Sequence, residues 1–82
     1  MKKSYVYILK CKDGTFYTGW TLDLNRRLTE HNSNNSKTKY TRNKRPVELV
    51  YFEECNSKSE AMKRECQIKQ LTKKQKIELI YH

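Results

Sequence analysis

Proline, glycine and cysteine are scarce in this sequence of 82 residues, which contains one proline, two glycines and three cysteines. No proline- or glycine-rich linker interrupts the chain. The cysteines Cys11, Cys55 and Cys66 are widely spaced and include no C-x-x-C pair, so the sequence indicates neither a zinc knuckle nor a disulfide framework. We expect three reduced thiols and a cytoplasmic protein.

Long apolar runs are missing as well. Hydrophobic residues make up 35% of the sequence, and the mean hydropathy is −1.06. No run is long enough for a signal peptide or a membrane span. A chain of this length buries only about 60% of its unfolded surface. We therefore expect one small domain, residues 1–82, with a thin core and no two-domain cleft.

Positive charge is what the sequence has in excess. Eighteen lysines and arginines against nine acidic residues give a net charge of +9 and a pI near 9.6. Such a surface attracts polyanions, so we expect DNA as the partner, with RNA as the alternative. A membrane partner is disfavoured because no basic amphipathic segment carries a broad face of large hydrophobic residues. Protein partners stay open, as does the choice between a monomer and a weak dimer.

The first half of the chain predicts a hairpin followed by a helix. SYVYILK favours a strand, Lys-Asp-Gly marks a turn and TFYTGW resumes strand character, which gives a hairpin over residues 4–20. Thr21 or Asp23 is suited to cap a helix with the interior LNRRLTEH, which the following asparagines end. The polar stretch 32–46 is predicted to be a loop.

The second half predicts one strand and two helices. The alternating run VELVYFE favours a strand over residues 47–53. Ser57 and Glu60 form a capping-box pattern ahead of the helix AMKRECQIKQL, and Thr72 and Gln75 repeat it ahead of KKQKIELIY. The order is therefore β-β-α-β-α-α. We expect an α+β fold in which helices flank a small three-stranded antiparallel sheet.

The hairpin and the next helix carry an unusual set of side chains. Tyr7 and Tyr17 are expected to face each other across or near the paired strands, and Gly19 permits close approach of a backbone or ligand. Aromatic pairs also stabilise hairpins without any further role. Arg27 and His31 have the spacing that puts them on the same helical face as two leucines, an uncommon place for polar groups.

Taken together, these residues resemble the paired motif of the GIY-YIG nuclease superfamily. The matching residues are Tyr5-Val6-Tyr7, Tyr17-Thr18-Gly19, Arg27, His31 and, in a later helix, Glu65. The chain is similar to the small stand-alone bacterial members over roughly residues 4–80. The resemblance implies a three-stranded antiparallel sheet surrounded by helices, in agreement with the order predicted above.

The match departs from the family pattern at three positions. Tyr5 stands where the first motif has glycine, and Thr18 replaces the isoleucine of the second. Trp20 follows Gly19 where some relatives place a basic residue, so one phosphate contact is missing there. We expect these changes to affect substrate geometry and rate more than the type of reaction.

The resemblance implies a metal-dependent endonuclease that hydrolyses DNA phosphodiester bonds, in DNA repair or processing. Arg27 would stabilise negative charge on the phosphate. Glu65 would be the single protein ligand of a Mg²⁺ or Mn²⁺ ion, which would bind weakly without DNA. Tyr17 is the candidate general base, with Tyr7 orienting the water or the phosphate, and His31 is an open alternative for the proton transfer.

Each of these polar residues also has a purely structural interpretation. Arg27 can lay its stem along the core and extend its charge into solvent. Glu65 can form an ion pair with Lys69 or Arg64. His31 is favoured near a helix C-terminus by the helix dipole.

A basic segment lies between the first predicted helix and the third strand. Its candidates for DNA contact are Lys37, Lys39, Tyr40, Arg42, Lys44 and Arg45. Cationic side chains bind phosphates without reading sequence, and a tyrosine can stack on an unpaired base. We expect structure-directed or nonspecific cleavage because so small a chain has little room for base readout. The alternatives are a non-catalytic nucleic-acid-binding module on the same scaffold and a protein-interaction domain.

Overall fold

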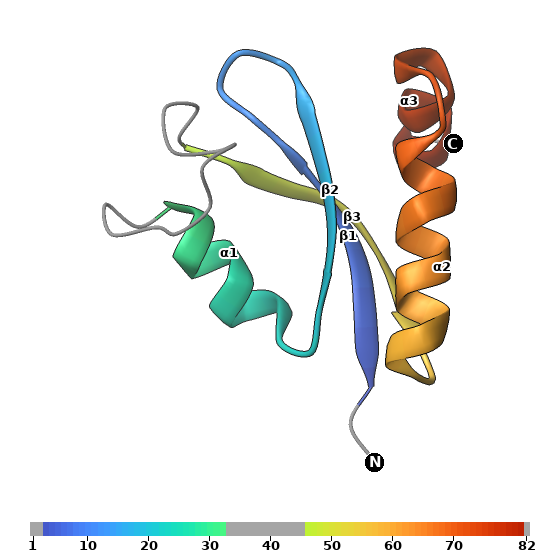
Figure 1. Cartoon of the computed structure of the whole chain (residues 1–82). Coiled ribbons are helices and arrows are strands. Elements are labelled where there is room, and N and C mark those ends of the chain that lie inside the picture. The colour runs from blue at the N-terminus through green and yellow to red at the C-terminus, as the bar shows by residue number, and fades with distance from the viewer. Residues whose placement is uncertain (1–2, 33–45, 82) are drawn as a thin grey trace.

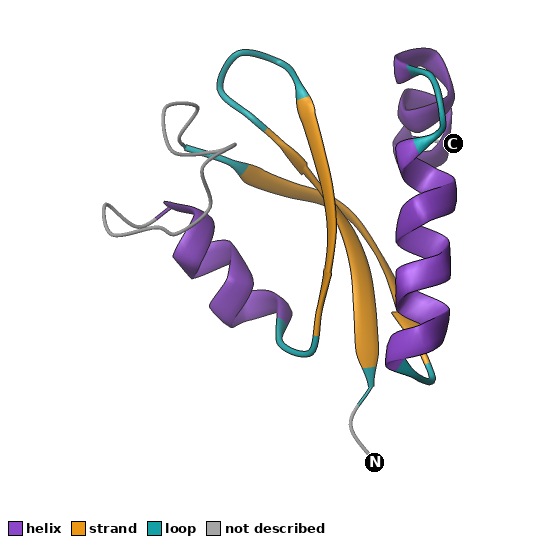
Figure 2. Ribbon diagram, in the orientation of Figure 1, coloured by secondary structure: helices purple, strands orange, loops and turns teal. Residues whose placement is uncertain are grey.

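The computed structural model describes residues 3–32 and 46–81, and these form one small sheet with flanking helices (Figures 1 and 2). The elements are β1 (Ser4–Lys10), β2 (Phe16–Thr21), α1 (Leu24–Asn32), β3 (Glu48–Cys55), α2 (Lys58–Lys69) and α3 (Lys73–Tyr81). The predicted α+β class and the order β-β-α-β-α-α are both confirmed. None of the described helices is long and apolar enough to cross a membrane.

The sheet has the strand order β2-β1-β3, so β1 lies in the centre and is antiparallel to both neighbours. Tyr7 on β1 is paired with Gly19 on one side and with Phe52 on the other. The third strand ends at Cys55 rather than at the predicted Glu53, because its last residue still pairs with Ser4 at the start of β1. β2 is an outer strand, so one of its edges pairs with no other strand of the described sheet. Side chains from elements on either face of the sheet can therefore reach this edge.

The two faces of the sheet are covered by different helices (Figure 1). The fully buried core on the α2 side consists of Val6, Ile8, Ala61 and Ile68. On the other face, Tyr7 and Leu9 pack with Cys11 and Val47, and Leu24 and Leu28 of α1 lie against them. The alternation of side chains along β1 therefore sends Tyr7 towards α1 and its neighbours Val6 and Ile8 towards α2.

Local capping fixes where the helices begin. The Arg26 amide donates to Asp23 Oδ1 over 3.1 Å, so Asp23 caps α1 and Thr21 instead accepts from the Asp23 amide. At α3 the predicted capping box is complete, because the Gln75 amide donates to Thr72 Oγ1 and the Thr72 amide donates to Gln75 Oε1. Ser57 caps α2, which therefore starts three residues before the predicted AMKRECQIKQL.

A side chain joins the end of α1 to the beginning of β3. Asn32 Oδ1 accepts from the Val47 amide over 2.8 Å, and Asn32 Nδ2 donates to the Val47 carbonyl over 3.2 Å. The amide group thus reproduces the double hydrogen bond of a strand neighbour. It ties together two chain positions that are far apart in the sequence, and so orients α1 against the sheet.

Candidate active site

A pocket of about 550 Å³ lies beside β2, and α1 and α2 border it from the two faces of the sheet. Its wall contains the predicted Tyr7, Tyr17, Arg27 and Glu65, together with Gly19. Its remaining lining residues are Trp20, Thr21, Leu22, Asp23, Arg26, Glu30 and Lys58. Residues of β1, β2, α1 and α2 therefore line one pocket, although they are far apart in the sequence, from Tyr7 to Glu65.

Gly19 allows Tyr7 to enter this pocket. A Cβ at position 19 would lie 2.7 Å from Tyr7 Oη and 2.9 Å from its Cζ, closer than real Cβ atoms approach other atoms. The same Cβ would lie 3.1 Å from Cε2 of Tyr17. The sequence led us to expect that a backbone or ligand would approach Gly19 closely. In the structure the ring of Tyr7, from the first motif, makes this close approach.

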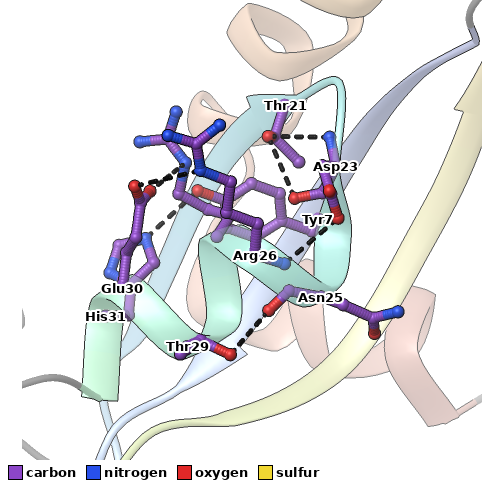
Figure 3. A network of polar contacts seen from close by, with 9 residues as sticks. Tyr7, Thr21, Asp23, Asn25, Arg26, Thr29, Glu30 and His31 are labelled. Carbon is purple, nitrogen blue, oxygen red and sulfur yellow. Dashed lines mark hydrogen bonds and ion pairs between the residues drawn. The ribbon is translucent and has the colours of Figure 1, made fainter.

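Tyr7 is hydrogen-bonded to His31 inside the protein (Figure 3). Tyr7 Oη lies 3.2 Å from His31 Nε2, and the two residues are 2% and 0% exposed. Burial, and then the nearby Tyr17, raises the pKa of Tyr7 well above its usual value. Burial, and then the charge of Arg27, lowers the pKa of His31 to about 4. At neutral pH this pair consists of a protonated phenol and a neutral imidazole.

His31 does not line the pocket, but it is hydrogen-bonded to Tyr7, which does. Its position in the last turn of α1 agrees with the helix-dipole interpretation, but its lowered pKa leaves it without the charge on which that interpretation depends. The Tyr17 ring lies 4.9 Å from the His31 ring and 6.3 Å from the Tyr7 ring, so the three rings form one cluster. Of the two bases left open by the sequence, Tyr17 is the one that borders the pocket.

Two arginines of α1 share one carboxylate at the pocket wall (Figure 3). Arg27 Nε lies 3.5 Å from Glu30 Oε1, and Arg26 Nε lies 3.7 Å from Glu30 Oε2. The Arg27 side chain is 42% exposed, so it combines a stem along α1 with a guanidinium group that solvent reaches. An incoming phosphate would compete with Glu30 for these two cations.

Glu65 is a pocket residue that also has a structural partner. Helix α2 packs on the face opposite α1, yet Glu65 borders the same pocket as Tyr17 because β2 is the outer strand. Its carboxylate lies 3.7 Å from Lys69 Nζ, one of the two partners expected. The other, Arg64, instead donates to Glu53 over 3.0 Å. The Glu65 side chain is 22% exposed, which leaves its carboxylate accessible from the pocket.

Lys58, the first residue of α2, lines the pocket and was not identified from the sequence. Within residues 3–32 and 46–81 it forms no ion pair with an acidic residue, unlike Arg26 and Arg27. It shares the pocket wall with Trp20, the position at which a basic residue is missing from the second motif. The sequence signal was weak, because only the packing of α2 against β2 brings Lys58 here.

The donor set at the pocket fits a hydrated divalent ion better than a protein-enclosed metal. In the part of the chain that the structure describes, no three His, Cys, Asp or Glu side chains form a group that could hold a metal. Mg²⁺ usually keeps several waters and binds through one or two carboxylates together with substrate phosphate oxygens. Glu65 matches that requirement as a single accessible carboxylate beside the cations of α1.

The predicted DNA contacts of the basic segment lie outside the described residues. They are Lys37, Lys39, Tyr40, Arg42, Lys44 and Arg45. They stay predictions. Asn32 and Val47, which flank this segment, are both described and are hydrogen-bonded to each other.

Comparison with known proteins agrees with this arrangement. The GIY-YIG catalytic domain matches residues 3–78. A UPF0213 protein of Syntrophus aciditrophicus is 51% identical over 80 residues, which cover 98% of this chain and 92% of that protein. The solution NMR structure of a protein from E. faecalis is 44% identical, with a TM-score of 0.63 over 100% of this chain and 93% of that chain. The solution NMR structure of a UPF0213 protein from Bacillus halodurans is also 44% identical, with a TM-score of 0.61 over 95% of this chain and 82% of that chain. The chain therefore belongs to the GIY-YIG catalytic domain family, a superfamily of nucleases.

Proposed function

We propose that this protein is a metal-dependent endonuclease that hydrolyses phosphodiester bonds of DNA, directed by structure or nonspecific, in DNA repair or processing. The observation that carries the proposal is the convergence of Tyr7, Tyr17, Arg27 and Glu65 on one pocket. These are the residue types that the reaction needs: a base for water, a fixed cation for the phosphate and a carboxylate for a divalent ion.

The cations of the pocket bind and orient the phosphate. Arg27 is permanently charged, and its planar group matches two phosphate oxygens. On the opposite wall, Lys58 supplies a point charge that no acidic side chain of the described residues neutralises. Positive charge held in place before the reaction stabilises the negative charge that develops in the transition state.

The two tyrosines divide the remaining work. The raised pKa of Tyr7 keeps its hydroxyl protonated, so it is suited to donate a hydrogen bond rather than to remove a proton. When His31 carries its proton on Nε2, it donates to Tyr7 Oη and leaves the Tyr7 proton directed at water or phosphate. Tyr17, which borders the pocket, is then the base for the attacking water.

Glu65 is the residue that would hold the divalent ion, Mg²⁺ or Mn²⁺, and the ion would supply further positive charge at the phosphate. Its ion pair with Lys69 spans 3.7 Å in a partly exposed position. Replacing Lys69 by a metal ion as the partner of Glu65 therefore costs little free energy. Because the protein offers one carboxylate, we expect the ion to bind weakly until DNA contributes oxygen ligands.

The test is a cleavage screen over single-stranded, nicked, flap and junction DNA with Mg²⁺ or Mn²⁺. We expect the wild type to cleave at least one of these substrates, and Arg27→Ala and Glu65→Ala to reduce the rate about a hundredfold or more. The matched control is Glu78→Ala on α3, an exposed glutamate outside the pocket. Salt-sensitive binding of DNA without cleavage of any substrate would instead support the non-catalytic binding module.

A further inference from the structure

A large aromatic side chain is exposed on the sheet beside the pocket. Phe52 of β3 is 54% exposed, although it is paired directly with the buried Tyr7 and shares its face of the sheet. The cause is the position of the Tyr7 ring, which lies over Gly19 on the β2 side and so leaves the β3 side uncovered. Phe52 therefore exposes an apolar ring on an outer strand of the sheet, directly beside the central strand.

Tyr5 extends this surface along β1. Its ring centroid lies 6.4 Å from that of Phe52, with the planes inclined at 65°, which is an edge-to-face contact. Helix α1 packs on the same face, where Leu24 and Leu28 lie against the buried cluster that contains Tyr7 and Leu9. We call the pair Tyr5 and Phe52 the aromatic face.

The size and charge of the aromatic face argue against a second copy of the chain as its occupant. A stable dimer interface needs about 800 Å² from each partner, whereas two partly exposed aromatic rings supply far less. Two chains that each carry +9 also repel each other. A positively charged chain with a small apolar surface is instead suited to one flat, uncharged group attached to a polyanion.

The residues around the aromatic face distinguish a base from a phosphate. Glu54, paired with Tyr5 across the strands, lies beside this surface, and Lys3 Nζ lies 3.8 Å from its carboxylate. Acidic charge repels a phosphate but not a neutral base. The pocket cations Arg27 and Lys58 lie on the β2 side, so the phosphate and the base have separate places.

The distance between those places is short. Phe52, Tyr7 and Gly19 occupy one row across β3, β1 and β2, and adjacent strands are about 4.8 Å apart. A ring at Phe52 therefore lies about two strand spacings from the pocket wall at Gly19. A base stacked there belongs to a nucleotide close to the phosphate in the pocket.

From this arrangement we propose that Phe52, with Tyr5 at its edge, stacks an unpaired base of DNA next to the phosphate held in the pocket. The inference rests on the proposed function and specifies its substrate class, which is DNA with unpaired bases beside the bond to be cleaved. A continuous duplex cannot use the aromatic face because its bases are stacked on each other.

The test measures binding in the presence of a chelator, so that no cleavage is required. A single-stranded oligonucleotide containing 2-aminopurine reports stacking by quenching of its fluorescence, and a duplex of the same sequence reports contacts to the backbone alone. The variant is Phe52→Leu, which keeps an apolar side chain. Its matched control is Met62→Leu on α2, because Met62 is 53% exposed and lies outside the pocket.

We expect Phe52→Leu to bind the single strand at least about fivefold more weakly and to lose the quenching, with duplex affinity unchanged within about twofold. Met62→Leu should bind both as the wild type does. Equal binding of the single strand by Phe52→Leu and wild type, or an equal loss for single strand and duplex, would overturn the proposal. If the wild type stacks the base but cleaves no DNA, the proposed hydrolysis is wrong and the role of the aromatic face stands. If the wild type cleaves DNA but Phe52→Leu stacks the base as the wild type does, the proposed hydrolysis stands and the role of the aromatic face is wrong.

Discussion

The hydroxyl of Tyr7 lies 2.7 Å from the point where a Cβ at residue 19 would begin. The tyrosine that ends the first motif and the glycine that ends the second are therefore one structural unit, in which the absent side chain of one residue makes room for the ring of the other. This relationship explains why β1 and β2 are paired in a register that sets Tyr7 against Gly19. It also places the Tyr7 hydroxyl at the pocket rather than beneath it.

Substitution Gly19→Ala should displace Tyr7 while leaving the fold intact. We expect at least a tenfold loss of cleavage, because the Tyr7 hydroxyl must move and its hydrogen bond to His31 must change. The matched control is Gly14→Ala, which meets no atom within 4 Å but has a positive φ of +86°. It should lower stability by about 1–2 kcal/mol and leave cleavage unchanged. Equal cleavage by the two variants would contradict the role given to this contact.

The stability of the protein should depend on pH through His31. Its pKa is about 4 in the folded protein and near 6.5 when unfolded, so the unfolded chain binds more protons between these values. The contribution of His31 to the free energy of unfolding is therefore fully present above pH 6.5. It is lost as the pH is lowered towards 4, a decrease of at most about 3 kcal/mol. Urea unfolding of wild type and His31→Gln from pH 7 to pH 4 measures the difference. Parallel curves for the two proteins would mean that His31 is not buried as the neutral form.

Asn32 should be a stabilising residue without a role in catalysis. Asn32→Ala removes two hydrogen bonds to Val47 and leaves the amide of that buried residue without its partner. We expect a loss of about 1–3 kcal/mol, or a fall in Tm of several degrees. Thermal unfolding measures it. Asn25→Ala, which truncates an exposed side chain of the same helix, should change Tm much less, and a similar fall in both variants would contradict the role of the Asn32 side chain.

Lys58 should contact a phosphate of bound DNA. Removal of one such contact lowers the slope of log affinity against log salt concentration by about 0.7 for a single strand. We expect this change for Lys58→Ala and not for Lys63→Ala, which removes an equal charge from an exposed position of the same helix outside the pocket. Fluorescence anisotropy titrations between 50 and 200 mM salt give the slopes. Identical slopes for the two variants would exclude the contact.

The features that the sequence predicted well depend on neighbouring residues. The hairpin, the capping box of Thr72 with Gln75 and the end of α1 are set by interactions over a few positions, so their patterns are visible in the sequence. The choice between Thr21 and Asp23 as cap was open, because the two residues are hydrogen-bonded to each other and either side chain is suited to the role.

What the sequence did not predict depends on packing between distant segments. Lys58 borders the pocket only because α2 crosses the sheet next to β2, and no local pattern marks that direction. The hydrogen bond between Tyr7 and His31 joins residues 24 positions apart, so periodicity indicated the buried face of His31 but not its partner. The exposure of Phe52 follows from the direction of the Tyr7 ring, which strand alternation alone does not give.

The most direct test of the active centre is the rate at which the protein cleaves DNA when a single carboxylate is replaced. Glu65→Gln keeps the shape of the side chain and removes its charge, and Glu78→Gln makes the same change on α3, outside the pocket. With Mg²⁺ and the best substrate of the screen, we expect Glu65→Gln to lose about a hundredfold or more in rate and Glu78→Gln to cleave as the wild type does. Equal rates for all three proteins would contradict the account.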